Sequence, residues 1–400
     1  MAGTSEDGTQ IDEVAQRANV PIEFVRRLAA LGVLGDDSPG AAARELGRVR
    51  LLYAWSQAGF PPETIMRLVE QKALSIMFLD SPGVQAPERL DRSYEEIAEE
   101  RDVPRSLLER LHESIGFEAP NPGDRAGEDD LALLDVMQVF RGVGVPDEPV
   151  IRLLAVYADA MRRLSKAEAE LYEANIEEGL RTTGMSEREL IEFGTQFGNR
   201  ASAALEQALT MVYRRQRVHV WAEHSVNHVE AALQAEGVES REPHPPTICF
   251  VDLTGYTRLT EERGDRFAAD VAARLASLVK DLSRRRGGSA IRWLGDGGMF
   301  HFREPERAVE AGLDMVEQAP AIGLPPAHIG IHAGSVIFQD GDVYGQTVNL
   351  ASRLASVAQA GEVVVSEDVA RRSSGIRFEE MGPVALKGVA IPMALFKATR

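Results

Sequence analysis

The stretch ICFVDLTGY, residues 248–256, decides how the second half of this chain folds. It has the apolar residues of a buried strand and ends at an acid, Asp252, followed by a Thr-Gly turn. A second strand-like run, residues 290–294, also ends at an acid, Asp296, which stands between two glycines. Mg²⁺ is usually held by one or two carboxylates together with substrate phosphates. The two strand ends therefore predict a divalent-metal site that binds a phosphate.

Composition limits the class of protein. The 400 residues exceed one compact core, so about two to four domains are expected. A net charge of −18 disfavours nucleic acid or an anionic membrane as a bulk partner. The one cysteine, Cys249, lies in the apolar strand, which excludes a disulfide framework and predicts a core residue. Neither a membrane-length apolar run nor a signal-peptide pattern occurs, so we expect a cytoplasmic location.

The first part of the chain repeats. Residues 11–21 match residues 94–104 at an offset of 83, and the Gly-x-Pro at 59–61 recurs at 144–146. This spacing predicts a tandem duplication of a four-helix unit, with one copy in residues 1–85 and the other in 86–158.

Each copy resembles the helix-turn-helix head of MerR-type regulators, through a helix, an Asn/Asp-Val-Pro turn, a longer helix and a Gly-x-Pro. DNA binding needs basic side chains that neutralise phosphates. The turn of the second copy is acidic instead (Glu95, Glu96, Glu99, Glu100 and Asp102). Nucleic acid is therefore disfavoured, and a helical scaffold for a protein or a small ligand is favoured. Arg26 and Arg27 of the first copy keep the DNA alternative open.

Residues 159–242 read as a helical regulatory or transducing segment, and the whole N-terminal half is predicted to be all-α. Helices are expected at 151–166, 167–183, 186–197 and 201–235. Ser186 is the expected N-cap of the third helix, and a proline-rich linker follows the fourth. The last helix either pairs with a second copy and transmits a rearrangement, or is a spacer. His224 and His228 share one face of it, either as a metal pair or as surface histidines that respond to protons.

Residues 243–400 alternate strands and helices. Strands are expected at 247–253, 289–294, 298–302, 327–333, 335–339, 362–366, 376–380 and 392–398, and helices at 261–286, 304–319 and 347–358. This order predicts an α+β domain with a ferredoxin-like βαββαβ core.

Four motifs in residues 247–398 together resemble the class III nucleotidyl cyclase catalytic domain: FVDLTGY, WLGDG, DVYGQTVNLASR and LKGV. The resemblance implies an adenylate cyclase that forms 3′,5′-cyclic AMP and pyrophosphate. It implies two Mg²⁺ or Mn²⁺ ions held by Asp252, Asp296 and the carbonyl of Leu253. It also places the backbone N–H groups of Thr254, Gly255 and Tyr256 at the phosphates, beside a helix N-terminus.

The same resemblance assigns Asn349 to the ribose, Arg353 to the α-phosphate and Lys387 to the terminal phosphates. Asn349 and Arg353 are spaced i, i+4, so they share one helix face. In the family this pair and the metal acids come from different subunits, which implies a homodimer with two equivalent sites.

Two positions are expected to select the base: Asp342, an acceptor for the adenine amino group, and residue 292, four positions before Asp296. The family has a lysine there, and this chain has Arg292. Arginine still donates to adenine N1, but its guanidinium is broader, so the exchange is not conservative. ATP is favoured over GTP, with low turnover. The alternative is a degenerate domain that binds nucleotide as a sensor.

Overall fold

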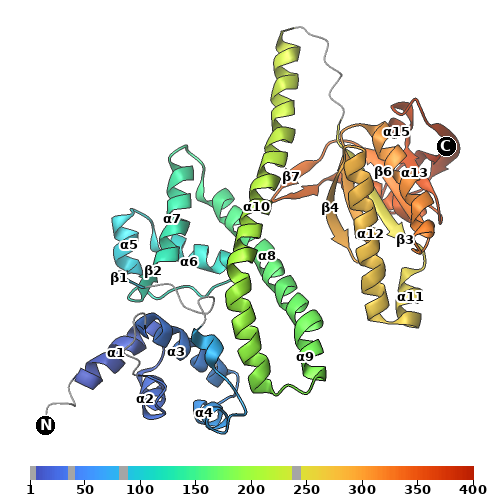
Figure 1. Cartoon of the computed structure of the whole chain (residues 1–400). Coiled ribbons are helices and arrows are strands. Elements are labelled where there is room, and N and C mark those ends of the chain that lie inside the picture. The colour runs from blue at the N-terminus through green and yellow to red at the C-terminus, as the bar shows by residue number, and fades with distance from the viewer. Residues whose placement is uncertain (1–5, 35–40, 81–88, 237–244) are drawn as a thin grey trace. The chain divides into compact units, whose positions relative to one another are not determined.

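The structure is a computed structural model that describes residues 6–34, 41–80, 89–236 and 245–400. The chain divides into two compact units, Met1–Ala232 and Leu233–Arg400. The first is built mainly from helices and the second from a mixed sheet with helices on it (Figure 1). The prediction of an all-α first half and an α+β second half is confirmed. The finer division at residues 85, 158 and 242 stays a prediction.

The first helical copy contains α1 (Glu6–Ala18), α2 (Ile22–Ala30), α3 (Ala41–Gln57), α4 (Pro62–Glu70) and the 3-10 turn η1 (Met77–Asp80). Between α1 and α2 the chain turns at Asn19, whose φ of 57° is the left-handed conformation that asparagine tolerates. The apolar faces of α2 and α3 then close on one core that includes Val25, Leu28 and Leu52.

The second copy contains β1 (Arg89–Ser93), α5 (Tyr94–Glu100), α6 (Arg105–Ile115), β2 (Arg125–Gly127) and α7 (Glu128–Arg141). Its turn residue Asp102 has a φ of 49°, and it stands 83 positions after Asn19. Gly59 and Gly144 also share a positive φ, at 93° and 82°. The matched positions therefore have the same backbone geometry. The sequence prediction missed the β1–β2 pair, because the two strands are short and polar.

Two long helices complete the helical unit, and here the predicted breaks were wrong. The predicted helices 151–166 and 167–183 form one rod, which runs from α8 (Asp147–Tyr172) through a π-helical turn, η3 (Glu173–Glu177), into α9 (Glu178–Thr182). Those at 186–197 and 201–235 form the single helix α10 (Glu187–Ala235). No proline lies at either predicted break, so nothing ends the helix at those points. Ser186 is the predicted N-cap: its hydroxyl accepts from the Glu189 N–H at 3.4 Å.

The second unit is organised by a seven-stranded sheet in the order β10-β11-β9-β6-β3-β5-β4. Its strands are β3 (Thr247–Leu253), β4 (Ser289–Leu294), β5 (Gly297–Phe302), β6 (Ala327–Ala333), β9 (Val363–Ser366), β10 (Arg377–Val384) and β11 (Met393–Thr399). Strand β3 lies in the interior, antiparallel to both β5 and β6. The opening stretch therefore forms an interior strand of the sheet, and Cys249 is fully buried there.

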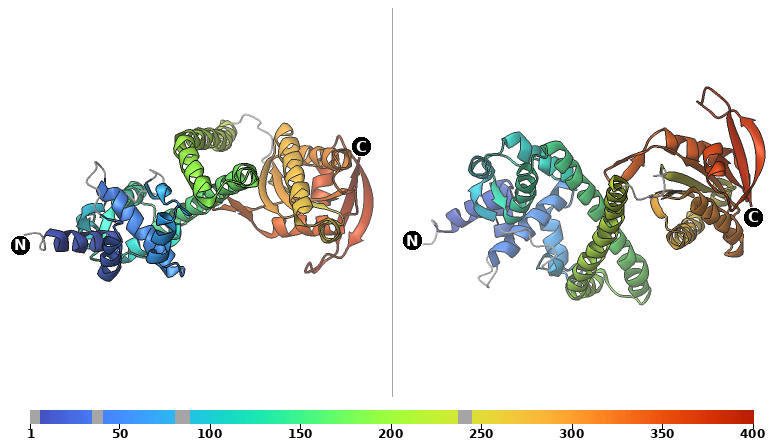
Figure 2. Two further views of the ribbon diagram at one scale, coloured as in Figure 1. Left: turned by 60° about the horizontal axis from the view of Figure 1, so that its bottom comes forward. Right: turned by 90° about the horizontal axis from the view of Figure 1, so that it is seen from above.

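Helices cover both faces of this sheet. Helices α12 (Asp265–Arg285) and α13 (Pro305–Ala321) lie together on one face, where they share a core with β3, β5, β6 and β9 (Figure 2). Helix α14 (Gln346–Val357) packs on the other face, against β3 and β6. The run β3, helix, β4, β5, α13, β6 is the βαββαβ core predicted from the sequence.

Three local predictions for this unit were wrong. The expected helix 261–286 is two helices, α11 (Tyr256–Arg263) and α12, because Gly264 (φ 82°) interrupts it. The expected strand 335–339 is shorter, β7 (Ile337–Gln339), and pairs with an unpredicted strand, β8 (Asp342–Tyr344). Positive φ values at Asp340 and Gly341 make the tight turn between them. The short helix α15 (Glu367–Arg371) was not predicted either.

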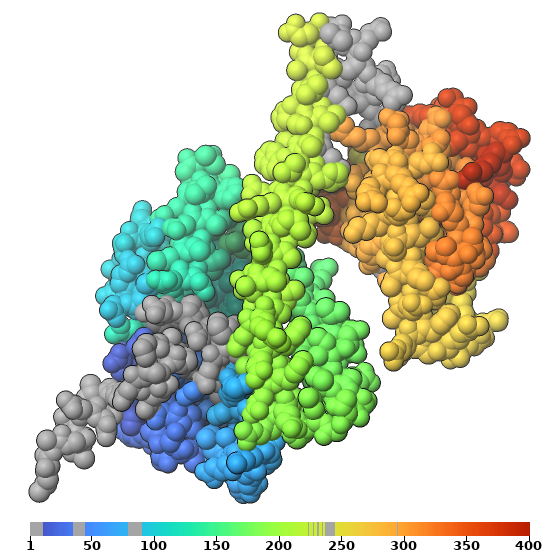
Figure 3. Space-filling model, in the orientation of Figure 1, coloured from blue at the N-terminus to red at the C-terminus, as the bar shows by residue number. Residues whose placement is uncertain are grey.

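Helix α10 exposes an unusual amount of apolar surface. Every residue from Thr210 to Ala222 is exposed. Figure 3 shows one side of this helix in yellow-green. The large apolar side chains left open on this helix include Met211, Val212, Val218, Val220, Trp221, Val226 and Val229. Large apolar side chains left exposed in this number on one helix are typical of an interaction site.

Candidate active site

Strand pairing brings the two predicted metal acids together. Asp252, near the end of β3, lies directly opposite Gly297, the first residue of β5. Asp296 immediately precedes Gly297 in the β4–β5 turn. A Cβ atom on Gly297 would lie 2.8 Å from the Val251 carbonyl and 3.5 Å from the Asp252 carboxylate. Only glycine lets the two strands, and with them the two acids, approach this closely.

The electrostatics of the pair fit a cation. Burial and the neighbouring charge of Asp296 raise the pKa of Asp252. The larger of two opposing contributions is the Leu253 N–H, which donates to Asp252 Oδ1 at 3.0 Å, and the smaller comes from His328. In the described parts of the chain no three His, Cys, Asp or Glu side chains form a metal cluster. Two carboxylates with the Leu253 carbonyl are an oxygen-only donor set, which suits Mg²⁺ or Mn²⁺ completed by phosphate and water.

The turn after β3 departs in part from its predicted role. The Thr254 N–H donates to the Pro326 carbonyl at 2.9 Å, so it is already used and does not point at a phosphate. Gly255 has a φ of 77° and caps the N-terminus of α11, as predicted for a phosphate turn. The Tyr256 hydroxyl donates to the Ala268 carbonyl at 3.0 Å, which ties α11 to α12.

A histidine beside the acids was missed by the sequence analysis. His328 on β6 is the cross-strand partner of Asp252. Its Nε2 lies 3.7 Å from Asp252 Oδ2, and its Nδ1 lies 3.2 Å from the Thr254 hydroxyl. The alternation of residues in β6 was readable from the sequence, but the strand opposite it was not.

Asn349 and Arg353 are placed by α14. The backbone of this helix lies directly on β6 at Gly330, where a Cβ atom would come within 2.0 Å of the Ala355 nitrogen. Arg353 Nη1 donates to the Gly388 carbonyl at 3.5 Å, so the LKGV loop holds the guanidinium. Asn349 and Lys387 are exposed. The structure thus joins Arg353 to the Lys387 loop and not to the carboxylates of its own chain.

The two predicted base-reading residues contact each other. Arg292, on β4, forms an ion pair with Asp342, on β8. The second carboxylate oxygen of Asp342 accepts from the Val343 N–H at 2.8 Å. The guanidinium also lies over the Tyr344 ring, 6.0 Å from its centroid. A donor and an acceptor are therefore presented side by side, and they satisfy one another when no base is present.

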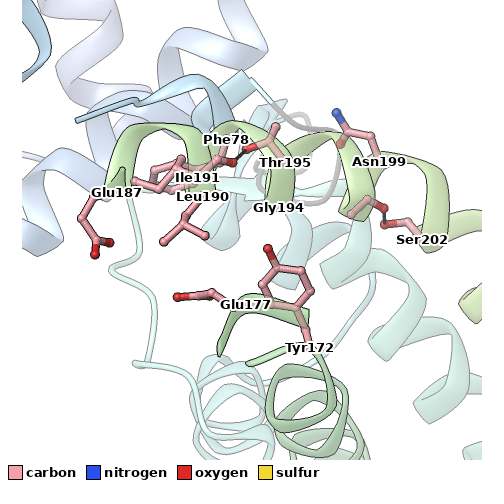
Figure 4. A pocket seen from close by; sticks show the side chains of 11 residues that line it. Phe78, Tyr172, Glu177, Glu187, Leu190, Ile191, Gly194, Thr195, Asn199 and Ser202 are labelled. Carbon is pink, nitrogen blue, oxygen red and sulfur yellow. Dashed lines mark hydrogen bonds between the residues drawn. The ribbon is translucent and has the colours of Figure 1, made fainter. Parts of the chain in front are cut away.

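The helical unit has a pocket of about 410 Å³ between α10 and the end of α8 (Figure 4). It is lined by Phe78, Tyr172, Glu177, Glu187, Leu190, Ile191, Gly194, Thr195, Gly198, Asn199 and Ser202. The Tyr172 hydroxyl fills the space where a Cβ on Gly194 would lie, at 2.6 Å. Burial and the charge of Glu177 raise the pKa of Tyr172. The π-helical turn at the pocket wall is of a kind often found at functional sites.

The two histidines of α10 do contact each other. Nε2 of His224 and Nε2 of His228 are 3.1 Å apart. Within the described residues no third metal-binding side chain joins them. Among the residues that the structure describes, no helix is both long and apolar enough to span a membrane.

Comparison with known proteins finds cyclases among the relatives of this chain. The family described as the adenylate and guanylate cyclase catalytic domain matches residues 238–397. The pH-sensitive adenylate cyclase of Mycobacterium tuberculosis (strain CDC 1551 / Oshkosh) is 26% identical over 320 residues, which cover 77% of this chain and 78% of that protein. An adenylate cyclase of Streptomyces coelicolor is 33% identical over 149 residues, 37% of this chain and 39% of that protein. The adenylyl cyclase CyaB from P. aeruginosa, a solved structure, is 24% identical, with a TM-score of 0.36, and the match covers 39% of this chain and 94% of that one.

The family match spans the predicted catalytic domain and both metal acids. Domains of this family generally use divalent metal ions. The MerR-like character of the helical copies has no such support and stays a prediction. Residues 238–397 therefore form a class III nucleotidyl cyclase catalytic domain, and the chain that carries it is an adenylate cyclase enzyme.

Proposed function

We propose that this enzyme converts ATP to 3′,5′-cyclic AMP and pyrophosphate, with two Mg²⁺ or Mn²⁺ ions, at a site shared by two copies of the chain. The observation that carries the proposal is the pair of carboxylates, Asp252 and Asp296, at the ends of neighbouring strands. Two like charges in a half-buried position are costly unless a cation joins them. The named adenylate cyclase relatives support the same chemistry.

In the reaction, the ribose 3′-oxygen attacks the α-phosphorus, the bond to the bridging oxygen breaks, and pyrophosphate leaves with the electron pair. Bound divalent ions supply a lower pKa for the 3′-hydroxyl and offset the phosphate charge. Asp252, Asp296 and the Leu253 carbonyl hold those ions. Asn349 orients the ribose, and the Arg353 fork stabilises charge on the α-phosphate. Lys387 and the Gly255–Tyr256 turn bind the outer phosphates.

The homodimer is supported by where Arg353 lies. Its hydrogen bond goes to the Gly388 carbonyl and not to the metal acids of its own chain. The carboxylates that Arg353 serves are therefore those of a second copy. The exposed apolar residues of α10, such as Val218 and Trp221, offer that second copy a further surface. Symmetric pairing of two chains then gives two equivalent sites.

Adenine is favoured over guanine by Asp342, which accepts from the N6 amino group and repels the guanine O6. Arg292 donates to adenine N1. Because the two side chains form an ion pair in the free protein, the base must open that pair to be read. An unmade polar contact of this kind costs about 1–3 kcal/mol, or roughly tenfold or more in rate.

The test is turnover of Mn²⁺-ATP by the purified chain, measured as cyclic AMP against an Asp252→Ala control. Product formation that depends on Asp252 supports the enzyme. Output from the wild-type chain no higher than from Asp252→Ala rules it out.

A second candidate function is nucleotide sensing without turnover. One observation favours it, the Arg292–Asp342 ion pair, because this pair occupies the groups that would read the base. Saturable ATP binding in the absence of cyclic AMP would identify it. DNA binding is further disfavoured, because the two arginines that would neutralise phosphates are paired with acids: Arg27 with Glu63 at 2.8 Å and Arg26 with Glu23 at 2.6 Å. Salt-dependent binding to duplex DNA would restore that function.

Regulation falls to the helical half. The pocket beside Tyr172 is suited to a small molecule, and the His224–His228 contact is a second candidate site for the signal. The relative named as pH-sensitive matches both halves of this chain. Deletion of residues 1–240 is expected to change the specific activity of the catalytic unit. An unchanged rate would remove the regulatory role.

A further inference from the structure

The start of strand β6 lies against the proposed metal site, and His328 is the side chain that makes the contact. β6 runs antiparallel to β3, with His328 opposite Asp252. The imidazole is largely enclosed, with 16% of its side chain exposed, whereas 48% of the Asp252 side chain is exposed. The ring therefore forms a wall of the site and leaves the carboxylate open on its other side.

Two contacts fix the orientation of this ring. His328 Nδ1 lies within hydrogen-bonding distance of the Thr254 hydroxyl, at 3.2 Å. Nε2 faces Asp252 Oδ2 at 3.7 Å, too long for a hydrogen bond, so this contact acts through charge and packing. One imidazole thus touches both the carboxylate that ends β3 and the turn that follows it.

The backbone repeats the same link. The Thr254 N–H donates to the carbonyl of Pro326, two residues before His328. The turn after β3 is therefore held to the start of β6 by a main-chain bond and by a side-chain bond. Loss of the imidazole would remove the side-chain bond and leave the main-chain bond in place.

A second histidine on the same strand provides the contrast. His332 Nδ1 lies 2.8 Å from the Ser366 hydroxyl on β9, and burial lowers the pKa of His332. It is opposite Ile248, in the apolar part of β3. His332 links two strands away from the acids, while His328 links a strand to the acids and to the phosphate turn.

We propose that His328 is a positioning residue for catalysis: it holds Asp252 and the Thr254 turn in the geometry that receives the metal ions and the phosphates. This rests on the proposed function for the identity of the site. His328 touches neither the reacting atoms nor the base, and it acts through Asp252 and Thr254. Side chains that orient metal ligands typically contribute about 10- to 100-fold to metal affinity or activity.

The experiment compares His328→Phe, His328→Asn and His332→Phe in the full-length chain. Mn²⁺ binding is measured by electron paramagnetic resonance without nucleotide, and kcat and KM are measured with Mn²⁺-ATP. His328→Phe keeps a ring and loses both nitrogens, so Mn²⁺ affinity and kcat are expected to fall about tenfold or more, with a smaller change in KM. His328→Asn keeps a polar atom near the Nδ1 position and is expected to recover most of the loss.

His332→Phe is the matched control, because it makes the same change on the same strand. It is expected to lower the thermal midpoint and to leave Mn²⁺ affinity within twofold of wild type. Wild-type Mn²⁺ affinity in a folded His328→Phe protein would overturn the proposal, as would equal losses in both phenylalanine variants. If the wild-type chain makes no cyclic AMP, the proposed function fails, while the Mn²⁺ measurement still decides the role of His328.

Discussion

Two aspartates, one in each unit, have opposite surroundings, although burial acts to raise the pKa of both. Asp130 in the helical unit accepts from the Tyr94 hydroxyl at 2.6 Å and from the Gly127 N–H at 2.6 Å, and it lies 2.9 Å from His112 Nε2. Burial acts to raise the pKa of Asp130, but these hydrogen bonds outweigh it, so the pKa is lowered. This carboxylate is satisfied by the fold itself.

Asp252 in the catalytic unit has the opposite balance. Burial and the charge of Asp296 raise its pKa, and the Leu253 N–H and His328 only partly offset them. A carboxylate surrounded by donors stabilises the fold, whereas one that faces a second carboxylate is held ready for a cation. The comparison separates a structural acid from a functional acid by the partners around it: burial raises the pKa of both, and only Asp130 has enough donors to reverse that effect.

The largest expected effect comes from neutralising the functional pair. Asp252→Asn or Asp296→Asn should lower cyclic AMP formation by about a thousandfold, the scale of losing a main source of transition-state stabilisation. The thermal midpoint should stay the same or rise, because the like-charge contact is relieved. Turnover assays and thermal unfolding of the same samples check both parts. A large loss of stability would make these acids structural, like Asp130.

Gly330→Ala should cause the next largest loss of activity, because it moves the helix that carries Asn349 and Arg353. The added Cβ would meet the backbone of α14, 2.0 Å from the Ala355 nitrogen and 2.4 Å from the Ala351 carbonyl. A displacement of about 1 Å can cost about a hundredfold in rate. We expect kcat to fall on that scale while Mn²⁺ binding at the carboxylates is retained.

The control is Gly312→Ala on α13, on the opposite face of the sheet. There the added Cβ would meet side-chain atoms of Val363 and Ile331 at 3.3–3.5 Å, which can adjust. Equal losses of activity in the two glycine variants would show that α14 has no special place in the site.

Arg292→Lys should raise activity moderately, whereas the preceding variants lower it. Lysine presents one compact charge in place of a fork, so the contact to Asp342 is easier to exchange for adenine. We expect kcat/KM for ATP to rise about tenfold, with little change for GTP. Arg284→Lys, in an exposed ion pair with Asp281, is the matched control and should change neither value. A rise for both nucleotides would show that Arg292 does not read the base.

Asp130→Asn should affect stability and not chemistry. A hydrogen-bonded, buried carboxylate of this kind contributes about 1–3 kcal/mol. Because the pKa of Asp130 is lowered in the folded chain, its contribution is present above the usual value of 3.8 and is lost as the pH falls through the folded value. Chemical unfolding at neutral and acid pH should show a destabilised variant with a flatter acid limb. An unchanged acid limb would contradict the assigned network.

The sequence was sufficient to predict the features that depend on local pattern. The apolar residues of the stretch that opens at Ile248 predicted β3, and the acids after two strand-like runs predicted the Asp252–Asp296 pair. Ser186, as an N-cap, predicted the start of α10. The breaks within α8–α9 and α10 were predicted wrongly, because a change in residue type does not end a helix when no proline or cap is present.

Features that depend on pairing between distant segments could not be read. His328 became a neighbour of Asp252 only through the β3–β6 register. The Arg292–Asp342 pair required β8, a three-residue strand made by a turn at Asp340 and Gly341. The Thr254 N–H was assigned to a phosphate, but the carbonyl of Pro326 was unforeseen and takes it.

The central claim is that one chain supplies Asp252 and Asp296 and a second chain supplies Asn349 and Arg353. It is tested most directly by mixing two inactive variants, Asp252→Ala and Arg353→Ala, after subunit exchange. Half of the dimers are then mixed, and each has one intact site, so cyclic AMP formation should recover to about a quarter of the wild-type rate. A mixture as inactive as either variant alone, in samples shown to exchange subunits, would contradict the shared site.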